Sequence, residues 1–134
     1  MLTKKVKIFN RLKRKIDINA VYKMGRVIIS TDRKLKVNHL YSNSETDQVK
    51  IAVSVSSKAG NSVWRNRFKR IVRESLRQEE KILKEIVFKN KLELSIIFSP
   101  YRINQTNNRR MFLEDIKPSV IDILNKISKT TIRI

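Results

Sequence analysis

The chain of 134 residues is long enough for one domain and too short for two well-buried cores. Its 31 lysines and arginines outnumber its 12 acidic residues, and the resulting formal net charge of +19 far exceeds what solubility needs. This excess favours a polyanionic partner, either nucleic acid or an anionic membrane surface. The 40% of hydrophobic residues exclude a wholly disordered basic tail, and the lack of cysteine excludes disulfides and thiolate metal sites.

A membrane protein is not expected. The longest apolar runs, such as SIIF, are far shorter than the roughly 20 residues of a spanning helix. Charges interrupt every apolar run near the N-terminus, so we expect no signal peptide. The sequence therefore predicts a soluble, cytoplasmic protein.

The first part of the chain is predicted to form one helix and two strands. Residues 1–10 are basic and expected to be loosely ordered, and Asp17 and Gly25 mark the start and the end of a short helix. Residues 26–30 are a strand candidate. Residues 34–42 alternate with period two, which places one set of side chains on a single face: Leu35, Val37, His39 and Tyr41.

After a polar turn at 42–48, residues 49–57 form a strand with two different faces. Its apolar face consists of Val49, Ile51, Val53 and Val55. Its other face consists of Lys50, Ala52, Ser54 and Ser56. Such small side chains leave room for the backbone of a binding partner to approach. An ordinary solvent-facing side of an antiparallel sheet would show the same pattern of residues.

The second half of the chain is predicted to form two helices and one strand. A helix over 62–80 continues to about residue 90 after a bend, and the apolar segment 92–99 is a central strand. Residues 109–128 show helical spacing of apolar residues, including Phe112, with Pro118 marking a kink or a start near it. Residues 129–134 are a frayed tail.

The predicted order is thus α-β-β-β-α-β-α in a single domain spanning 1–134. This order indicates an α/β (α+β) two-layer sandwich, in which helices pack against one face of a four-stranded mixed sheet.

The segment GNSVWRNRFKRIVRE (60–74) carries the strongest functional signal. At 3.6 residues per turn, one arc of the helix holds Trp64, Phe68, Ile71 and Val72, which we assign to the core and not to base stacking. The opposing side holds Arg65, Asn66, Lys69, Arg70, Arg73 and Arg77, with Arg67 further round. No acid occurs between Arg65 and Arg73, and arginine predominates, which favours phosphate binding over a merely solvated face.

The sequence offers little for catalysis by the protein itself. Its one histidine, His39, lies at a strand position, no carboxylate pair stands out, and the two glycines form no phosphate-cradling loop. We therefore expect no catalytic residue and no metal site on the protein alone.

Residues 52–75, AVSVSSKAGNSVWRNRFKRIVRES, resemble the signature of the bacterial ribonuclease P protein component. The resemblance rests on a Ser-Val-Ser strand end, Lys58, the Gly60-Asn61 turn, the Arg-Asn-Arg series and the Lys-Arg pair that follows it. The order of elements agrees with that family over roughly residues 11–128. The resemblance implies a ribosomal-protein-like sandwich with a left-handed crossover. It also implies that an RNA subunit, with Mg²⁺ bound chiefly by RNA, removes the 5′ leader of precursor tRNA.

The resemblance also assigns residues to two surfaces. Docking on the ribonuclease P RNA would use Asn61, Arg65, Asn66, Arg67, Lys69, Arg70 and Arg73. The leader of precursor tRNA would lie in a cleft between the first helix and the sheet, lined by Ile18, Tyr22, Val37, His39, Ser54, Ser56 and Lys58. Ile18 replaces a usual aromatic residue and Ser57 a usual lysine, which weakens the leader contact more than RNA docking. No obligate protein partner is expected.

Three other interpretations remain open. A ribosomal-type structural RNA-binding protein would share the charge, size and fold. Only the Ser-Lys-Gly-Asn-Arg-Asn-Arg series argues against this interpretation. A DNA-binding regulator needs side chains aimed at base edges, whereas this helix offers phosphate-type contacts. A peripheral membrane protein needs exposed bulky apolar residues beside its charges, but here they are predicted to face the sheet.

Overall fold

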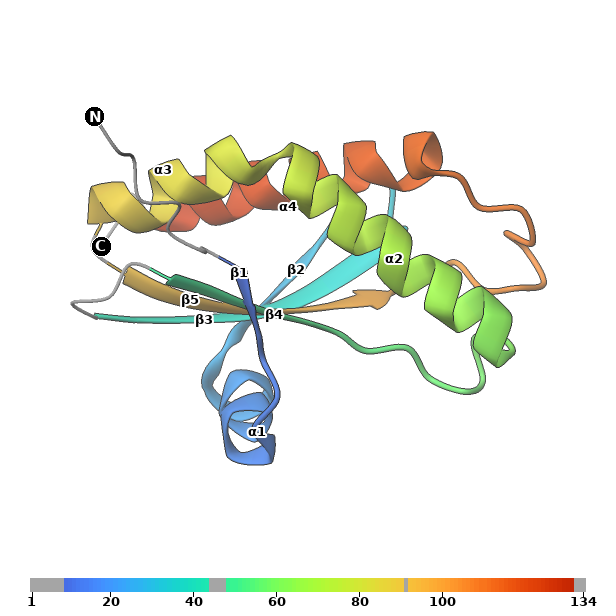
Figure 1. Ribbon diagram of the computed structural model, residues 1–134, viewed down its shortest axis with the longest axis horizontal. Coiled ribbons are helices and arrows are strands. Elements are labelled where there is room, and N and C mark those ends of the chain that lie inside the picture. The colour runs from blue at the N-terminus through green and yellow to red at the C-terminus, as the bar shows by residue number, and fades with distance from the viewer. Residues whose placement is uncertain (1–8, 44–47, 91, 132–134) are drawn as a thin grey trace.

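The computed structural model describes residues 9–43, 48–90 and 92–131. In chain order its elements are β1 (Phe9–Arg11), α1 (Lys15–Met24), β2 (Arg26–Ile29), β3 (Leu35–Asn43), β4 (Gln48–Val53), α2 (Ser62–Gln78), α3 (Glu80–Asn90), β5 (Leu92–Pro100) and α4 (Leu113–Thr131). Helices α2, α3 and α4 lie on one side of the sheet, and α1 lies alone on the other (Figure 1).

The sheet is mixed, as predicted, but it has five strands in the order β1-β4-β5-β3-β2. β4 pairs in parallel with both β1 and β5, whereas β3 is antiparallel to β5 and β2. The fifth strand corrects the expectation of loose order for residues 9 and 10, since Phe9–Arg11 is β1. Residues 1–8 of that expectation lie outside the described residues. Three residues are too few to show a periodic pattern, and pairing with β4 fixes this segment, ending with Leu12 N–H donating to Ile51 O at 2.9 Å.

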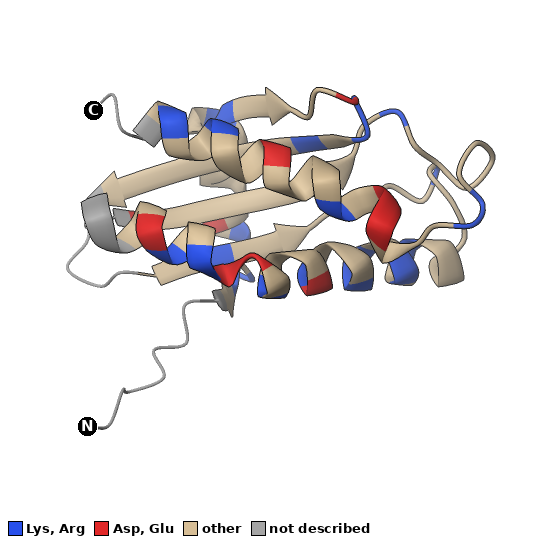
Figure 2. Cartoon of the chain, turned by 90° about the horizontal axis from the view of Figure 1, so that it is seen from above, with Lys and Arg blue, Asp and Glu red and all other residues tan. Residues whose placement is uncertain are grey.

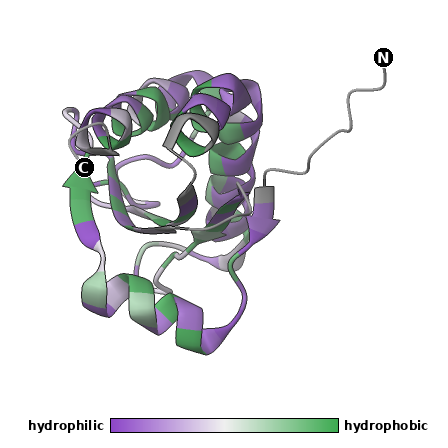
Figure 3. Cartoon of the chain, turned by 90° about the vertical axis from the view of Figure 1, so that its left-hand side faces the viewer, coloured by the Kyte–Doolittle hydropathy of each residue, from purple (hydrophilic) through white to green (hydrophobic). Residues whose placement is uncertain are grey.

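The central position of β5, predicted from its apolar sequence, is confirmed. Ile96, Ile97 and Phe98 are consecutive and all buried, so both faces of this strand are covered. This corrects the expectation of helices on one face only: α1 closes a small second cluster with Leu12, Val21 and Ile97. Figure 3 shows the sheet between the layer of α2, α3 and α4 and the single helix α1.

The parallel strands β4 and β5 are joined by a crossover through α2 and α3. The left-handed sense of this crossover stays a prediction. α2 and α3 are separated at Glu79, whose backbone (φ −105°, ψ 25°) leaves the helical region, so the expected bend is confirmed.

The ends of α1 agree only partly with expectation. α1 begins at Lys15, so Asp17 lies in its first turn and is not its N-cap. Gly25 follows the helix as predicted, and its N–H donates to Val21 O at 2.9 Å. A Cβ atom at Gly25 would collide with Val21 O and lie 2.6 Å from His39 O, so only glycine fits between α1 and β3.

Other boundaries also differ from prediction. β4 ends at Val53, after which Ser54 N–H donates to Phe98 O at 2.8 Å and the chain leaves the sheet. α4 begins at Leu113, so it contains Pro118, and it runs through Thr131, which corrects the frayed tail for 129–131. Phe112 precedes the helix and is half exposed, outside the apolar stripe. Residues 132–134, and 44–47 of the polar turn, lie outside the described residues.

None of the helices in the described part of the chain is long and apolar enough to cross a membrane.

Candidate nucleic-acid interface

The Gly60-Asn61 turn sets the start of α2. Asn61 Oδ1 accepts a hydrogen bond from Trp64 N–H at 2.9 Å, which caps the helix, and Asn61 N–H donates to Gln105 Oε1 at 2.9 Å. A Cβ atom at Gly60 would lie 3.0 Å from both Gln105 Cβ and Trp64 Cε3. The residues of this turn therefore fix the helix against the 101–112 loop, and Asn61 remains exposed at its end.

The apolar arc of α2 is buried as predicted. Trp64 is 3% exposed and Phe68 is fully buried, with their rings 5.9 Å apart, and Ile71 and Val72 join the same core. The indole N–H of Trp64 donates to Asn108 O at 3.0 Å, so its one polar atom is satisfied. These aromatic rings are core residues and are not available to stack on bases.

The basic side of α2 divides into an outer face and two flanks. Asn66, Arg70 and Arg73 are exposed on the outer face, whereas Arg65 and Lys69 are half-buried. Arg65 and Arg67 lie about 200° apart around the helix axis, so they emerge on different flanks.

The two flanking arginines have different surroundings. Arg67 Nε donates to Met111 O at 2.8 Å, and its guanidinium carbon lies 5.6 Å from the ring centre of Phe112. Arg65 carries a buried Nε with no hydrogen-bond partner among the described residues. In the Arg-Asn-Arg series, the exposed amide of Asn66 thus lies between two arginines, Arg65 and Arg67, whose surroundings differ.

The positive charge of α2 is mostly unbalanced. Among the described residues, no ion pair reaches the basic residues from Arg65 to Arg73, whereas Arg77 pairs with Glu74 at 2.9 Å. Figure 2 shows basic residues along α2 and acidic residues only towards its α3 end. Burial lowers the pKa of Arg73 below its ordinary value, and the positive charge of Arg11 lowers it further. This direction is expected for a cation that lies near another cation and has no counter-charge beside it among the described residues.

A groove lies beside α2, between α1 and the sheet edge. Its first part, with a volume of about 470 Å³, is lined by side chains that include Ile18, Tyr22 and Ser54. Its second part, of about 440 Å³, continues along Tyr22, Ser54, Ser56 and Lys58. Because Tyr22 and Ser54 line both parts, the two parts form one feature, which we call the groove. Five of the seven residues predicted for a leader cleft therefore come together.

The groove exists because β1 is short. Pairing of β1 with β4 ends at Arg11 and Ile51, so no strand of the described residues pairs with that edge of β4 from Ala52 onward. The side chains there are small, and Ser54 and Ser56 are exposed as predicted. Lys50, at the other end of the same face, pairs instead with Glu93 at 2.9 Å.

Val37 and His39 do not line the groove, which corrects their assignment. Val37 is fully buried in the large cluster beneath α2, α3 and α4, together with Leu35. His39 is 1% exposed, and its ring lies 5.9 Å from that of Tyr41, which packs on the same cluster. Burial, and then the charge of Arg26, lower the pKa of His39. The alternation of β3 correctly grouped these residues, but they face away from α1.

Several groove residues were not predicted for this site. Lys36 and the 41% exposed Tyr101 line its second part, and Arg11 and Lys13 line its first part. The alternation of β3 could have indicated Lys36, since it faces opposite to Val37. Tyr101 follows β5 in a polar loop and carries no such signal.

Two residues connect the groove with the basic helix. Lys69 and Arg73, predicted only for RNA docking, line the first part of the groove from the α2 side. The two predicted surfaces therefore adjoin, and one continuous nucleic-acid strand could contact both. Across residues 9–43, 48–90 and 92–131, no group of three or more histidine, aspartate or glutamate side chains is placed to hold a metal ion.

Comparisons with known proteins agree with these features. The family model described as Ribonuclease P matches residues 6–116. The ribonuclease P protein component of Staphylococcus epidermidis is 37% identical over 79 residues, which are 58% of this chain and 66% of that protein. That of Macrococcus caseolyticus is 37% identical over 76 residues, or 56% of this chain and 64% of that protein. The matched part thus spans slightly less than two thirds of these relatives.

Solved structures show the same architecture. The RNase P protein of Staphylococcus aureus superposes with a TM-score of 0.63 at 28% identity and covers 89% of this chain and 94% of that one. The RNase P protein of Thermotoga maritima gives a TM-score of 0.66, covering 87% of this chain and 96% of that one. At 19% identity, the second likeness supports the fold alone.

Proposed function

Because the chain belongs to the ribonuclease P protein family, we propose that it is the protein subunit of a ribonuclease P ribonucleoprotein. In this proposal the RNA subunit performs the cleavage that removes the 5′ leader of precursor tRNA and gives the mature 5′ end. The protein binds both RNAs and acts in the cytoplasm without an obligate protein partner.

One observation carries the proposal: cations of α2 from Arg65 to Arg73, which form no ion pair with a described residue, adjoin a groove with small side chains and an exposed tyrosine. The outer face of α2, with Asn66, Arg70 and Arg73, would dock on phosphates of the RNA subunit. The groove would hold the leader, with Tyr22 as a stacking platform and Lys58 beside the backbone. Ile18 lines the groove without offering an aromatic ring, so Tyr22 would carry the stacking on α1.

The protein would help the reaction in two ways. Its net charge of +19 neutralises phosphates and releases counterions, so RNA assembly is favoured and depends strongly on salt. A leader held in the groove is present in the precursor and absent from the product, so the contact distinguishes the two. Magnesium, held chiefly by RNA phosphates, would supply the activated water for hydrolysis.

A reconstituted cleavage assay tests the proposal. The purified chain is mixed with a bacterial ribonuclease P RNA and 5′-labelled precursor tRNA, at magnesium too low for the RNA to act alone. We expect release of the intact leader only when both subunits are present. The double variant Lys69→Glu/Arg70→Glu should abolish the rescue, whereas Lys81→Glu, an exposed charge on α3, should retain it.

The variant pair avoids Arg67, whose hydrogen bond to Met111 O gives it a structural role as well. If the chain binds the RNA but never rescues cleavage, the ribosomal-type interpretation replaces this proposal. The charge, size and fold suit that alternative equally, and only the cleavage readout separates the two.

A further inference from the structure

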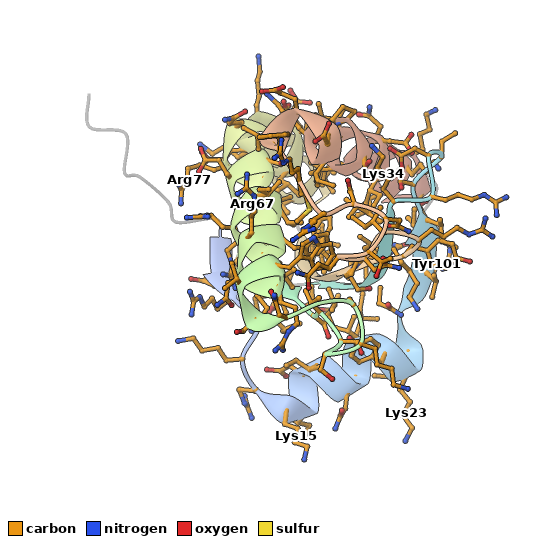
Figure 4. All side chains as sticks on the ribbon, turned by 90° about the vertical axis from the view of Figure 1, so that its right-hand side faces the viewer. Lys15, Lys23, Lys34, Arg67, Arg77 and Tyr101 are labelled. Atoms are coloured by element: carbon orange, nitrogen blue, oxygen red, sulfur yellow. The ribbon has the colours of Figure 1, made fainter. Side chains whose placement is uncertain are left out.

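A surface of exposed apolar and basic side chains lies on the flank of α2 that carries Arg67. Val63 precedes Arg67 by about one helical turn and is 76% exposed, and Phe112, beside Arg67, is 50% exposed. None of these three residues lines either part of the groove. Figure 4 shows the 101–112 loop on one side of α2 and β1 on the other. This surface is therefore separate from the groove.

The 101–112 loop is fixed to the region around the start of α2. Gln105 N–H donates to Ala59 O at 2.7 Å, and at the end of the loop Arg67 Nε donates to Met111 O at 2.8 Å. A surface that is held in place before binding loses less conformational entropy when a ligand binds. The loop thus presents its last residues as a preorganised surface.

Phe112 stands just before α4, where the fold itself does not require an aromatic ring. Its N–H donates to Asp115 Oδ2 at 3.0 Å, so a carboxylate of the first turn satisfies this backbone group. A residue with a side-chain oxygen, such as serine, is preferred before a helix, and a half-exposed ring buries little apolar area. Neither helix capping nor burial therefore accounts for phenylalanine at this position.

The ring of Phe112 is held from one side and open to solvent elsewhere. The guanidinium carbon of Arg67 lies over the ring, 5.6 Å from its centre, and the bond from Arg67 Nε to Met111 O fixes this guanidinium. The exposed part of the ring is a flat apolar surface of the kind on which unpaired nucleobases stack. In this arrangement Arg67 is a positioning residue for Phe112.

The charges around the ring favour a polyanion. Arg109 and Arg110, which lead into Phe112, are exposed and form no ion pair with any residue that the structure describes. The carboxylates nearest to the ring along the chain are those of Glu114 and Asp115, and both lie in the first turn of α4, where the helix N-terminus offsets their charge. With the arginine on α2, three cations therefore outweigh two carboxylates.

We propose that Phe112 stacks on one unpaired base of the ribonuclease P RNA while Arg67 positions the ring. Arg109 and Arg110 contact the phosphates that flank this base. The stacking surface stands on the contacts described above, whereas the identity of its partner rests on the proposed function. The RNA subunit is assigned because the surface continues into the outer face of α2 at Arg70, three residues after Arg67, and does not continue into the groove.

The first test measures binding of the full chain to a bacterial ribonuclease P RNA at several salt concentrations. Phe112→Ala should weaken binding roughly tenfold, the size of one lost base stack, with an unchanged salt slope. Phe112→Tyr retains a ring and should bind normally. Arg109→Gln and Arg110→Gln should each lower the slope of log K against log salt by about 1. Met24→Ala, the loss of another exposed apolar side chain, should change neither quantity.

Phe112→Ser separates binding from folding. Serine supplies a capping oxygen and no ring, so this variant should melt no lower than the unsubstituted chain and should still lose about tenfold in binding. Full affinity in both Phe112→Ala and Phe112→Ser, or an equal loss in Met24→Ala, would overturn the stacking surface.

A double-variant cycle tests the positioning role of Arg67. Arg67→Lys keeps the charge but loses the planar guanidinium that donates to Met111 O and lies over the ring. Because both residues serve one stack, Arg67→Lys combined with Phe112→Ala should weaken binding no more than the larger single effect. Losses that multiply would show that Arg67 contacts RNA by itself, and would overturn its positioning role.

The partner is identified with the holoenzyme, reconstituted with enough of each variant to saturate the RNA subunit. Phe112→Ala should leave the binding of precursor and mature tRNA unchanged, because the ring contacts the RNA subunit. Weaker binding of precursor tRNA, with full affinity for the RNA subunit, would overturn this assignment in favour of the leader. If the unsubstituted chain never rescues cleavage, the proposed function fails, and the loss in Phe112→Ala still decides whether this surface binds RNA. If cleavage is rescued and every Phe112 variant binds normally, this inference fails alone.

Discussion

The two faces of the sheet differ in what they bury. Beneath α2, α3 and α4 lies a continuous cluster that includes Phe68, Phe98 and Ile96, all fully buried. Beneath α1 the buried hydrophobic cluster of the described residues consists of Leu12, Val21 and Ile97, and the groove opens beside it. One face thus supplies most of the hydrophobic stabilisation, which leaves the other free to remain partly open.

Neighbouring residues of β5 allow this difference to be measured directly. Ile96 and Ile97 have the same side chain and are both buried, but they face opposite sides of the sheet. We expect Ile96→Ala to cost about 4 kcal/mol of unfolding free energy and Ile97→Ala about 2 kcal/mol, because the smaller cluster can collapse around the lost volume more easily. Urea denaturation of both variants checks this, and equal losses would contradict the division into a large core and a small cluster.

On the groove side the expected loss is in binding and not in stability. Tyr22 is 47% exposed, so Tyr22→Ala should leave Tm nearly unchanged. It should weaken holoenzyme binding of precursor tRNA by about 1–3 kcal/mol, the range for one stacked base, and leave mature tRNA binding unchanged. Tyr22→Phe retains the ring and should bind normally. The control Met24→Ala changes another exposed α1 residue and should have no effect; a loss equal to that of Tyr22→Ala would argue against stacking.

A substitution on the outer face of α2 should change the salt dependence of RNA binding more than it changes folding stability. Arg70→Ala removes one exposed cation that has no ion pair among the described residues, and should weaken RNA-subunit binding by about 1 kcal/mol. The slope of log K against log salt should also fall by about 1, the value for one lost phosphate contact. Titrations at several salt concentrations check this against Lys81→Ala, and an unchanged slope in Arg70→Ala would mean that Arg70 contacts no phosphate.

The smallest effect is expected at the β2–β3 turn, which Asp32 joins to α4. Burial by itself would raise the pKa of Asp32, but hydrogen bonds from Ser119, Ser30 and Lys34 N–H outweigh it and lower that pKa. The folded-state pKa thus lies below the unfolded value of about 3.9, so this stabilisation exists above about pH 4 and is lost as pH falls through the folded pKa.

Asp32→Asn should therefore lower the unfolding free energy at pH 7 by less than about 1 kcal/mol, since the carboxylate is exposed to solvent. The difference from the unsubstituted chain should disappear near pH 2. Urea denaturation across this pH range provides the measurement, and a difference that stays constant with pH would show that the carboxylate charge is not responsible.

Long periodic patterns allowed much of the fold to be predicted. The seventeen residues of α2 separate apolar from basic positions clearly, and the apolar Trp64, Phe68, Ile71 and Val72 are buried as expected. The apolar sequence of β5 correctly indicated a central strand. These predictions succeeded because burial dominates the choice of side chains, on one face of α2 over several turns and on both faces of β5 along the whole strand.

The remaining features depend on contacts between distant segments. Alternation grouped Val37 with His39, but which side of the sheet they face is decided by packing of α1 and α4, not by β3 itself. β1 has too few residues for a pattern and exists through pairing with β4. Likewise Lys36 reaches the groove from β3 and Tyr101 from the loop after β5, and only the register of β3 with β5 brings them near each other.

The position of β5 also has a consequence for how the chain folds during synthesis. β5 pairs with β3 on one side and β4 on the other, yet it follows every other strand in the sequence. Until Leu92–Pro100 has been made, the β2–β3 hairpin and the β1–β4 pair are separate two-stranded pieces, which are marginally stable in water. The basic helix α2 is therefore complete before the sheet that anchors it can close. A nascent chain released before residue 92 should expose this cationic segment without a folded domain behind it.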